Sequence, residues 1–436
     1  MGGGLSRLLF RLYDVVLAFT IAIVLFPTEV VSIILGRSRI ELLRERLGAT
    51  LGISSESHPI LLVHAVSVGE MAAARSLITS LKEEIPSVRF ILTTGNREGR
   101  EAAEQLRSAY PEIVEVSYLP WDRHAATRNW MQHINPSAVI VIETEIWPNL
   151  FRSASELSIP LFIVSGRIYP KDRSRYWLAR HFFRSVLKSV NWIGVQSEEE
   201  RNSFIRAGAP GDHVEVVGNL KHDTVVSQKL PQPWEVVFEH PNCANLIVAG
   251  STHHPEEAWL IEALHRLRQS DLLACLVLAP RHPGRADAVQ RKVVSAGWVA
   301  ARWSEGPPAN GNWEVLILDK VGPLAAVYQW ADVAVIGGSL IRRGGHNPLE
   351  AAHHSRAIVV GPHHEHFREI VHGLDQAGGI RVLPQAGDVR QALFSALREL
   401  MQDSRQRKEM GHHAFAYVRN HHGIARRYAR TLVARI

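Results

Sequence analysis

The 436-residue sequence has little cysteine, with only Cys243 and Cys275, which lie far apart in the chain. Two cysteines and no CxxC pair exclude a disulfide-rich scaffold and give no sign of a zinc or redox site. Two phosphate-binding signatures are also missing. The sequence has no GxxxxGK(S/T) loop and no GxGxxG after a strand-like run, so we expect neither a P-loop NTPase nor a dinucleotide-dependent redox enzyme.

Hydrophobic residues make up 46% of the chain and charged residues 21%, which excludes wholesale disorder. Lysine and arginine outnumber the acids by 49 to 43, giving a net charge of +6. A basic balance suits an anionic partner such as a phosphate ligand or an anionic lipid. The basic residues are dispersed and no stacking motif accompanies them, so nucleic acid is not an expected partner.

Among the 23 histidines, three of the five adjacent pairs invite a metal interpretation. Neighbouring histidines point in different directions on a strand or helix, and no HExxH or other spaced ligand set is present. We therefore predict no metal site. The pairs are His253-His254, His353-His354 and His363-His364.

The N-terminal segment holds an uncharged apolar run between Asp14 and Glu29. A membrane span needs about 20 apolar residues, so this run indicates a marginal span or a helix lying in the interface; a buried core helix is the third possibility. No cleavage site of the signal-peptide type follows. Four arginines within residues 37–46 would keep the main body cytoplasmic, whereas Arg7 and Arg11 on the other side favour an interfacial anchor.

From residue 60 onwards, short apolar runs alternate with helical segments, which is typical of parallel βαβ units. The predicted strands cover residues 59–67, 89–95, 137–145, 160–166, 192–197 and 213–219 in one series, and 245–253, 272–282, 313–319, 331–339 and 357–363 in a second. We predict an α/β fold of two Rossmann-like domains facing a cleft at the strand ends. The predicted boundaries are a membrane anchor with a basic flank at 1–46, a first domain at 47–225, a proline-containing linker at 226–243, and a second domain with C-terminal helices at 244–436.

Three strand ends of the second series carry polar or glycine-rich clusters that predict an anion-binding rim. In the longest, Asn347 and Pro348 open a helix, whose free N–H groups suit a phosphate, and Glu350 suits ribose hydroxyls. Arg281, after another strand, offers a planar fork to a phosphate. The third cluster is residues 250–253.

In the first series, Glu70 lies at a glycine turn after the first predicted strand, where a carboxylate is placed to act as a general base. Its alternative role is that of a solvated helix-start acid. Glu143 and Glu145 end another strand beside Trp147, and Lys221 follows the last strand, where it suits a leaving phosphate.

Taken together, these motifs resemble those of the 3-deoxy-D-manno-octulosonic acid (Kdo) transferases, the lipid A glycosyltransferases of Gram-negative bacteria. In the family's order, the chain carries HAVSVGE, ETEIWPNL, GNLKHD, GSTHHPEE, APRHPGR, GGSLIRRGGHNPLEAA and GPHHEHFREI. The resemblance covers nearly the whole chain, including the N-terminal anchor. The combination of ETEIWPNL with GGHNPLEAA is specific.

The resemblance implies a GT-B fold with an acceptor domain first and a CMP-Kdo-binding domain second. It implies inverting transfer of Kdo from CMP-Kdo to a lipid A precursor (lipid IVA), with Glu70 as the base and with Glu143 and Lys221 stabilising the transition state. The matching CMP contacts are Pro280, Arg281, Val321, Gly322, Pro323, Asn347, Pro348, Leu349 and Glu350. No metal cofactor is expected, because the donor has a single phosphate.

The same resemblance places the protein at the inner membrane, anchored by its N-terminus, with the catalytic domains cytoplasmic and the anionic membrane surface as a partner. Two alternatives remain open. One is a GT-B enzyme that uses another nucleotide sugar; the other is a membrane-docked, nucleotide-binding relative without catalysis, which the presence of Glu70, Glu143 and Lys221 disfavours.

The chain departs from the family pattern at several motifs. Pro323 stands where an acid is usual and puts one CMP contact in doubt. The segments 94–97 and 165–169 also differ, and histidines occupy positions 222 and 366, where phenylalanine and asparagine are common. Most of the first-domain changes would affect the acceptor side, so the structure of the acceptor and the number of Kdo units transferred stay open.

Overall fold

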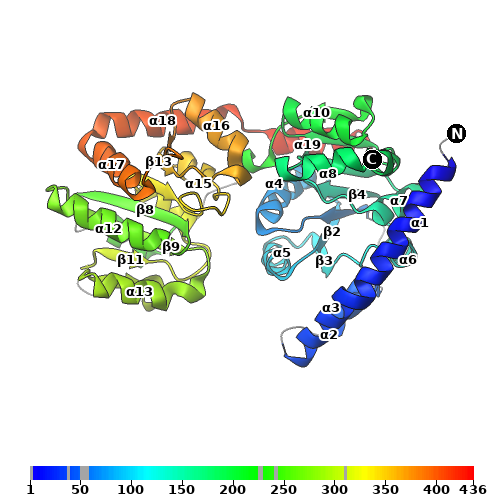
Figure 1. Cartoon of the computed structure of the whole chain (residues 1–436), viewed down its shortest axis with the longest axis horizontal. Helices are drawn as coiled ribbons and strands as arrows, with labels where there is room; N and C mark the ends of the chain where they lie inside the picture. The colour runs from blue at the N-terminus through cyan, green and yellow to red at the C-terminus, as the bar shows by residue number, and fades with distance from the viewer. Residues whose placement is uncertain (1–2, 37–39, 50–57, 224–228, 240–243, 309–311) are drawn as a thin grey trace. The chain divides into compact units, whose positions relative to one another are not determined.

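The computed structural model describes residues 3–36, 40–49, 58–223, 229–239, 244–308 and 312–436. The chain divides into two compact units (Figure 1). Unit 1 comprises Met1–Thr224 with Gly423–Ile436, and unit 2 comprises Val225–His422. Each unit is built on one seven-stranded sheet in which the paired strands are all parallel.

The sheet of unit 1 has the order β3-β2-β1-β4-β5-β6-β7. Most of its strands are apolar and fully buried, because helices cover both faces of a parallel sheet. The strand order reverses between β1 and β4, so the loops after these two strands open at the switch point. The strands are β1 Ile60–His64, β2 Arg89–Thr94, β3 Ile113–Tyr118, β4 Ala138–Ile142, β5 Leu161–Gly166, β6 Trp192–Val195 and β7 Val214–Val216.

The helices of unit 1 that follow the strands pack their apolar faces on the sheet. Asn96 and Ser197 cap two of them with side-chain oxygens, as the sequence signals for helix starts predict. These helices are α4 Val68–Glu84, α5 Arg97–Ala109, α6 His124–Ile134, α7 Pro148–Glu156, α8 Pro170–Leu178, α9 Arg180–Leu187, α10 Glu198–Ala207 and α19 Ile424–Val433, with short helices η2 Gly211–His213 and η3 Leu220–Asp223.

Unit 2 repeats the plan with the order β10-β11-β9-β8-β12-β13-β14, and its switch point lies between β8 and β12. Its strands are β8 Asn245–Thr252, β9 Ala274–Pro280, β10 Ala300–Arg302, β11 Val315–Ile317, β12 Val333–Ile336, β13 Ala357–Val360 and β14 Arg381–Val382. Its helices are α11 Gln232–Glu239, α12 Glu256–Gln269, α13 Ala286–Ser295, α14 Leu324–Val327, α15 Leu349–His353, α16 Arg368–Gln376, α17 Val389–Gln402 and α18 Ser404–Asn420, with short helices η4 Pro283–Arg285, η5 Trp303–Glu305, η6 Tyr328–Trp330 and η7 Glu365–Phe367.

The observed boundaries differ from the predicted ones at two places. The middle of the predicted linker forms α11, whose Trp234 and Phe238 are buried in the core of unit 2. The last helix, α19, was predicted to belong to the second domain, but it packs in unit 1, where Tyr428 is buried and donates a hydrogen bond to the Gly218 carbonyl. An apolar face on α19 thus completes the core of the first sheet rather than the second.

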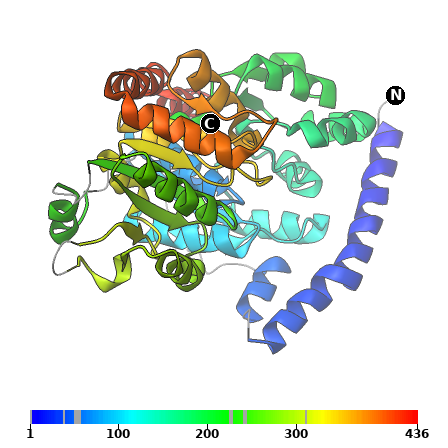
Figure 2. The same cartoon turned by 60° about the vertical axis from the view of Figure 1, so that its left-hand side comes forward.

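The N-terminal apolar segment forms one long helix made of α1 Gly3–Thr20, the π-helical segment η1 Ile21–Leu25 and α2 Phe26–Ile34 (Figure 2). Pro27 explains the π segment, since proline has no N–H to give to the carbonyl four residues earlier. Residues Ser6–Ile34 are long and apolar enough to cross a membrane by length and composition. A further helix, α3 Ile40–Arg46, follows.

Candidate active site and nucleotide-binding edge

The acidic and basic residues singled out in the first series lie at the carboxyl edge of the unit 1 sheet. Glu70 follows β1 and Glu143 follows β4, the two strands that flank the switch point. Lys221 lies in η3, after the edge strand β7. The structure therefore brings together three side chains that are separated by up to 151 positions in the sequence.

Glu70 lies in the first turn of α4 and is held on both carboxylate oxygens. Its Oε2 accepts a hydrogen bond from the Val66 backbone N–H at 2.8 Å, and its Oε1 accepts one from the Ser67 hydroxyl at 2.9 Å. Ser67 Oγ in turn caps the Glu70 backbone N–H. Burial and the nearby charge of Glu143 raise the pKa of Glu70 to about 7, so this carboxylate combines a helix-capping position with a proton affinity suited to neutral pH.

Glu143 and Lys221 form a buried ion pair. Lys221 Nζ donates to Glu143 Oε1 at 2.5 Å, and the two side chains are only 10% and 4% exposed. Burial alone would raise the pKa of Glu143, but the charges of Lys221 and Arg167 hold it below the ordinary value. Glu143 also has a positive φ of 60°, a strained backbone for a non-glycine residue.

Arg167 and Tyr169 complete the surroundings of Glu143. Arg167 is buried and its guanidinium lies 4.2 Å from the centre of the Tyr169 ring. The Tyr169 hydroxyl hydrogen-bonds to Glu143. Motif reasoning registered this segment only as a departure from the family pattern and missed its contact with Glu143. Its only sequence signal was its position after a buried strand.

His64 and Trp147 link the loops after β1 and β4. Trp147 Nε1 donates to His64 Nε2 at 3.2 Å, and His64 Nδ1 lies 3.0 Å from the Thr93 hydroxyl. Because an indole nitrogen only donates, His64 carries its proton on Nδ1. Burial lowers the pKa of His64 to about 3, so it is neutral. Trp147 also contacts Glu145, whose pKa is raised by burial despite that hydrogen bond.

In unit 2, the predicted nucleotide contacts all follow strands of one sheet edge. Pro280 ends β9 and Arg281 comes next; residues 321–323 lie in the turn after β11; residues 347–350 follow β12. The predicted helix after Asn347 is short. It starts at Leu349, has Pro348 at its N-cap and ends at His353, so it supplies only one turn of oriented N–H groups. Asn347 Oδ1 accepts from the Leu349 N–H at 3.0 Å.

A stacked histidine pair lies at the switch point of unit 2. The rings of His253 and His346 are 5.3 Å apart and nearly parallel, with their Nε2 atoms 3.0 Å apart. Burial and the neighbouring cations lower the pKa of His346 to about 3, and burial also lowers that of His253. The pair is therefore neutral, and Arg281 supplies positive charge beside it. Sequence reasoning considered His253 only as a metal ligand, which it discarded, and did not foresee its pairing with His346.

Glu256 is a second residue that sequence reasoning missed. It is fully buried at the start of α12, and its carboxylate accepts from the backbone N–H groups of His253, Gly338 and Leu340 at 2.8, 2.8 and 3.1 Å. Burial raises its pKa to about 7. Glu256 thereby ties the loop after β8 to the loop after β12. Its position three residues after His253 in GSTHHPEE was the available signal.

Glu350 lies in the first turn of α15, where burial raises its pKa to about 7. Its carboxyl group lies near the buried Tyr328 and raises the pKa of that phenol. A carboxyl group in this position can accept hydrogen bonds from ligand hydroxyls without first breaking an ion pair within the part of the chain that the structure describes.

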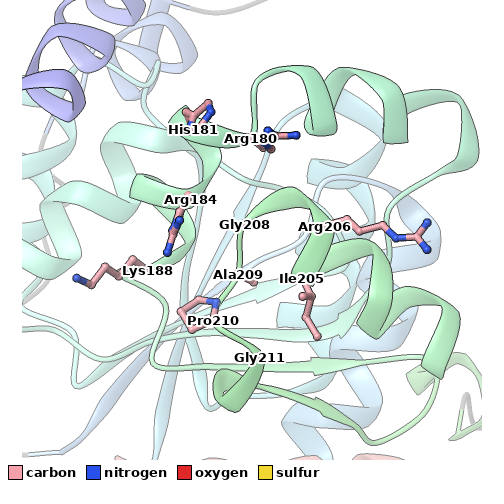
Figure 3. Close-up of a pocket in the computed structure, with 10 residues that line it drawn as sticks. All are labelled: Arg180, His181, Arg184, Lys188, Ile205, Arg206, Gly208, Ala209, Pro210 and Gly211. Carbon is pink, nitrogen blue, oxygen red and sulfur yellow. The ribbon is translucent and has the colours of Figure 1, made fainter. Parts of the chain in front are cut away.

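Histidine, cysteine, aspartate and glutamate side chains form no group of three or more suited to a metal ion among the described residues. A basic cavity of about 520 Å³ lies elsewhere in unit 1, between α9, α10 and the turn before η2 (Figure 3). Because α10 ends and β7 begins there, the cavity lies toward the opposite edge of the sheet from Glu70. Its charged lining is Arg180, Arg184, Lys188 and Arg206.

Two Rossmann-like units with polar loops at the carboxyl edge of each sheet form the architecture of the GT-B fold. Comparisons with known proteins agree. Solved structures of the UDP-GlcNAc 2-epimerase from Neisseria meningitidis and of a glycosyltransferase from Rickettsia africae share the fold, with TM-scores of 0.59 and 0.56 at 13% and 11% identity. Each comparison covers 86% of this chain, and 100% and 98% of the respective structures.

Comparisons of sequence identify the family more specifically than the fold does. Residues 41–224 match the sequence model described as 3-deoxy-D-manno-octulosonic-acid transferase (kdotransferase). The Kdo transferase of Bordetella pertussis is 32% identical over 84% of this chain and 85% of its own length, and that of Haemophilus influenzae is 26% identical over 88% and 89%. The chain belongs to the Kdo transferase family, and the resemblance inferred from its motifs is confirmed.

Proposed function

We propose that this Kdo transferase takes Kdo from CMP-Kdo and transfers it, with inversion at C2, to a hydroxyl of a lipid A precursor such as lipid IVA. The acceptor oxygen forms a bond to C2 while its proton passes to Glu70. The bond from C2 to the phosphate oxygen breaks at the same stage, and CMP leaves with the electron pair. An oxocarbenium-like transition state is expected for such a transfer.

The Glu70 carboxylate, held by two hydrogen bonds at the switch point of the unit 1 sheet, is the observation that carries this proposal. A base with a pKa of about 7 is half ionised at neutral pH and still binds a proton well. Its two hydrogen bonds orient the carboxylate. Because Glu143 and Lys221 hold opposite charges in a buried pair, they supply a fixed electric field for the developing positive charge of the sugar and the leaving phosphate.

The edge of unit 2 suits the donor. Arg281 offers a planar cation for a single phosphate, and Glu350 offers an acceptor for ribose hydroxyls. Residues 321–323 and 347–349 would complete the CMP contacts mainly through backbone groups, so the loss of an acid at Pro323 need not remove the turn's role. A single phosphate balanced by Arg281 requires no divalent cation, and we expect turnover in the presence of EDTA.

The membrane side of the proposal rests on charge and hydropathy. The N-terminal helix exposes large apolar residues along its length, among them Leu12, Phe19 and Ile23. The basic cavity of unit 1 adds four cationic side chains for anionic headgroups (Figure 3). We therefore place the enzyme at the inner membrane, N-terminally anchored, with its catalytic units cytoplasmic and an anionic lipid surface as partner.

A radiolabelled lipid IVA assay, with CMP-Kdo generated in situ and products resolved by thin-layer chromatography, tests this function. We expect one or more shifted products from the wild-type enzyme and none from Glu70→Gln. Glu98→Gln is the matched control, because Glu98 is an exposed acid in the first turn of the neighbouring helix α5. Product formed equally well by Glu70→Gln would remove Glu70 as the base. Stabilisation of the protein by UDP but not by CMP would contradict the donor.

A further inference from the structure

We propose that the N-terminal helix is a working part of the catalytic unit, in which Tyr13 and Asp14 are positioning residues for the loop 143–149. The inference rests on the proposed function in one respect, namely that this loop carries the catalytic charge of Glu143. It goes beyond membrane anchoring, because it gives the helix a role that persists when no bilayer is present.

Two polar side chains of α1 reach into unit 1. The Tyr13 hydroxyl donates to Asp122 Oδ2 at 2.8 Å, and Asp14 Oδ1 accepts from Asn149 Nδ2 at 2.6 Å. Aromatic contacts accompany them, with Tyr13 and Phe10 each packed on Phe182 of α9, at centroid distances of 5.6 and 5.4 Å. A carboxylate in an otherwise apolar helix is costly unless it is paired, so these contacts hold this face of the helix against the unit.

Asp122 is the centre of the connection. Its buried carboxylate accepts from the backbone N–H groups of Asn149 and Leu150 at 2.9 and 2.8 Å, in addition to Tyr13. These N–H groups belong to the first turn of α7 and have no partner within their own helix, so Asp122 caps α7 from a distant segment. The Asn149 amide also donates to the Asp122 backbone carbonyl at 2.6 Å.

The capped end of α7 continues directly into the acidic loop. Trp147 is the N-cap residue of α7 and donates to His64, and Ile146 donates its backbone N–H to the Thr144 carbonyl. Glu143 and Glu145 lie in the same stretch. A shift of the α7 N-terminus would therefore move both acids relative to Glu70 and Lys221, and displacements of about 1 Å can cost roughly 100-fold in rate.

The outer face of the same helix carries no such contacts. Leu12, Val16 and Phe19 are 58%, 57% and 64% exposed, whereas Phe10 and Ile21 are buried against the unit. The helix is thus divided into a lipid-compatible face and a face that is bonded to the catalytic unit. This division favours a helix that lies along the unit, in the membrane interface, over one that leaves the unit to cross the bilayer.

The test compares the two faces in detergent micelles with lipid IVA and CMP-Kdo. Asp14→Ala removes the acceptor for Asn149, whereas Asp14→Asn retains an oxygen at that position and should restore function. Leu12→Ser is the control from the outer face. We expect Asp14→Ala combined with Tyr13→Phe to lower kcat by about tenfold or more with an unchanged KM for CMP-Kdo, and both Asp14→Asn and Leu12→Ser to stay within about twofold of the wild type.

Hydrogen exchange supplies a readout that needs no turnover. In Asp14→Ala, the amides of residues 143–150 should exchange faster, and in Asp14→Asn and Leu12→Ser they should not. Wild-type kcat in the double variant, unchanged exchange in Asp14→Ala, or equal damage by Asp14→Ala and Asp14→Asn would overturn the proposal. If the wild-type enzyme gives no product, the proposed donor and acceptor fail, and the exchange measurement still decides the role of the helix.

Discussion

The carboxyl edges of the two sheets differ in the kinds of residues that they bring together. In unit 1, the loops after β1 and β4 and the η3 segment after β7 gather full charges, with Glu70 facing the field of the Glu143–Lys221 pair. In unit 2, the loops at the switch point hold a neutral histidine pair and are tied together by Glu256 through backbone N–H groups. In the function that we propose, proton transfer in unit 1 uses opposed charges held in place, whereas nucleotide binding in unit 2 uses shaped backbone and one cation, Arg281.

The largest expected effect that separates the two sheet edges comes from a change at Glu70. Glu70→Gln should lower kcat by about 10²- to 10⁴-fold, since general-base catalysis contributes that much. CMP affinity, which we propose that unit 2 provides, should be unchanged. Steady-state turnover and isothermal titration with CMP measure the two effects, with Glu98→Gln as the control. A parallel loss of CMP binding would show that the two edges are not separate in function.

Removal of one partner of the buried ion pair should strongly lower the free energy of unfolding of unit 1. Lys221→Met leaves Glu143 buried without its cation, which should destabilise the protein by about 3 kcal/mol or more. The double variant Glu143→Gln with Lys221→Met should recover much of this loss, because no uncompensated charge remains. Urea denaturation of the wild type and the two variants checks the prediction. A double variant as unstable as Lys221→Met would show that the pair does not act as a unit.

Glu256 should stabilise unit 2, as the buried ion pair of Glu143 and Lys221 should stabilise unit 1. Glu256→Gln removes the charged acceptor shared by three backbone N–H groups, which should cost about 1–3 kcal/mol and loosen both ligand loops. CMP affinity should fall about tenfold or more, a consequence of the disordered loops. Glu262→Gln, an exposed acid of the same helix α12, is the control for titration with CMP.

The pH dependence of turnover tests the role of Glu70 as the base without a substitution at that residue. Glu70 must be ionised to accept a proton, so kcat/KM should rise with pH through about 7 and then level off. Glu145→Gln removes a nearby carboxylate that raises the pKa of Glu70 and should move the rising limb to lower pH. Rates measured between pH 5.5 and 8.5 test both. A rising limb near pH 4.5 would assign the base to another, unperturbed carboxylate.

The smallest expected effect is on the pH dependence of stability in unit 2. Glu350 has a pKa of about 7 when folded, against an ordinary value of 4.5, so the folded state binds the extra proton between these values. Stability should therefore fall as pH rises from about 4.5 to 7. Glu350→Gln should make this slope shallower in thermal unfolding at pH 5 and 7.5, while Glu409→Gln, at an exposed position of α18, should leave it unchanged.

Apolar runs in the sequence predicted eleven of the strands, and the structure confirms them. The strands that the pattern missed, β3, β10 and β14, all lie at sheet edges. An edge strand is covered less completely, so its residues need not be uniformly apolar; β3, for example, carries the half-buried Glu115. The predicted linker also contains α11, which the sequence did not reveal because eight residues with one proline show no clear helical period.

Residue types at strand ends were enough to nominate Glu70, Glu143, Lys221 and the 347–350 segment, because the topology of parallel sheets brings strand ends to one edge. The family also followed from the motifs. What the sequence did not reveal is which groups pair: Tyr169 with Glu143, His253 with His346, Glu256 with three N–H groups, and Asp14 with Asn149. Contacts between segments far apart in the chain depend on packing, and burial in that packing moves the pKa values of the carboxyls. The order of residues along the chain determines which side chains reach the sheet edges, whereas only the tertiary structure decides which groups pair and how they are charged.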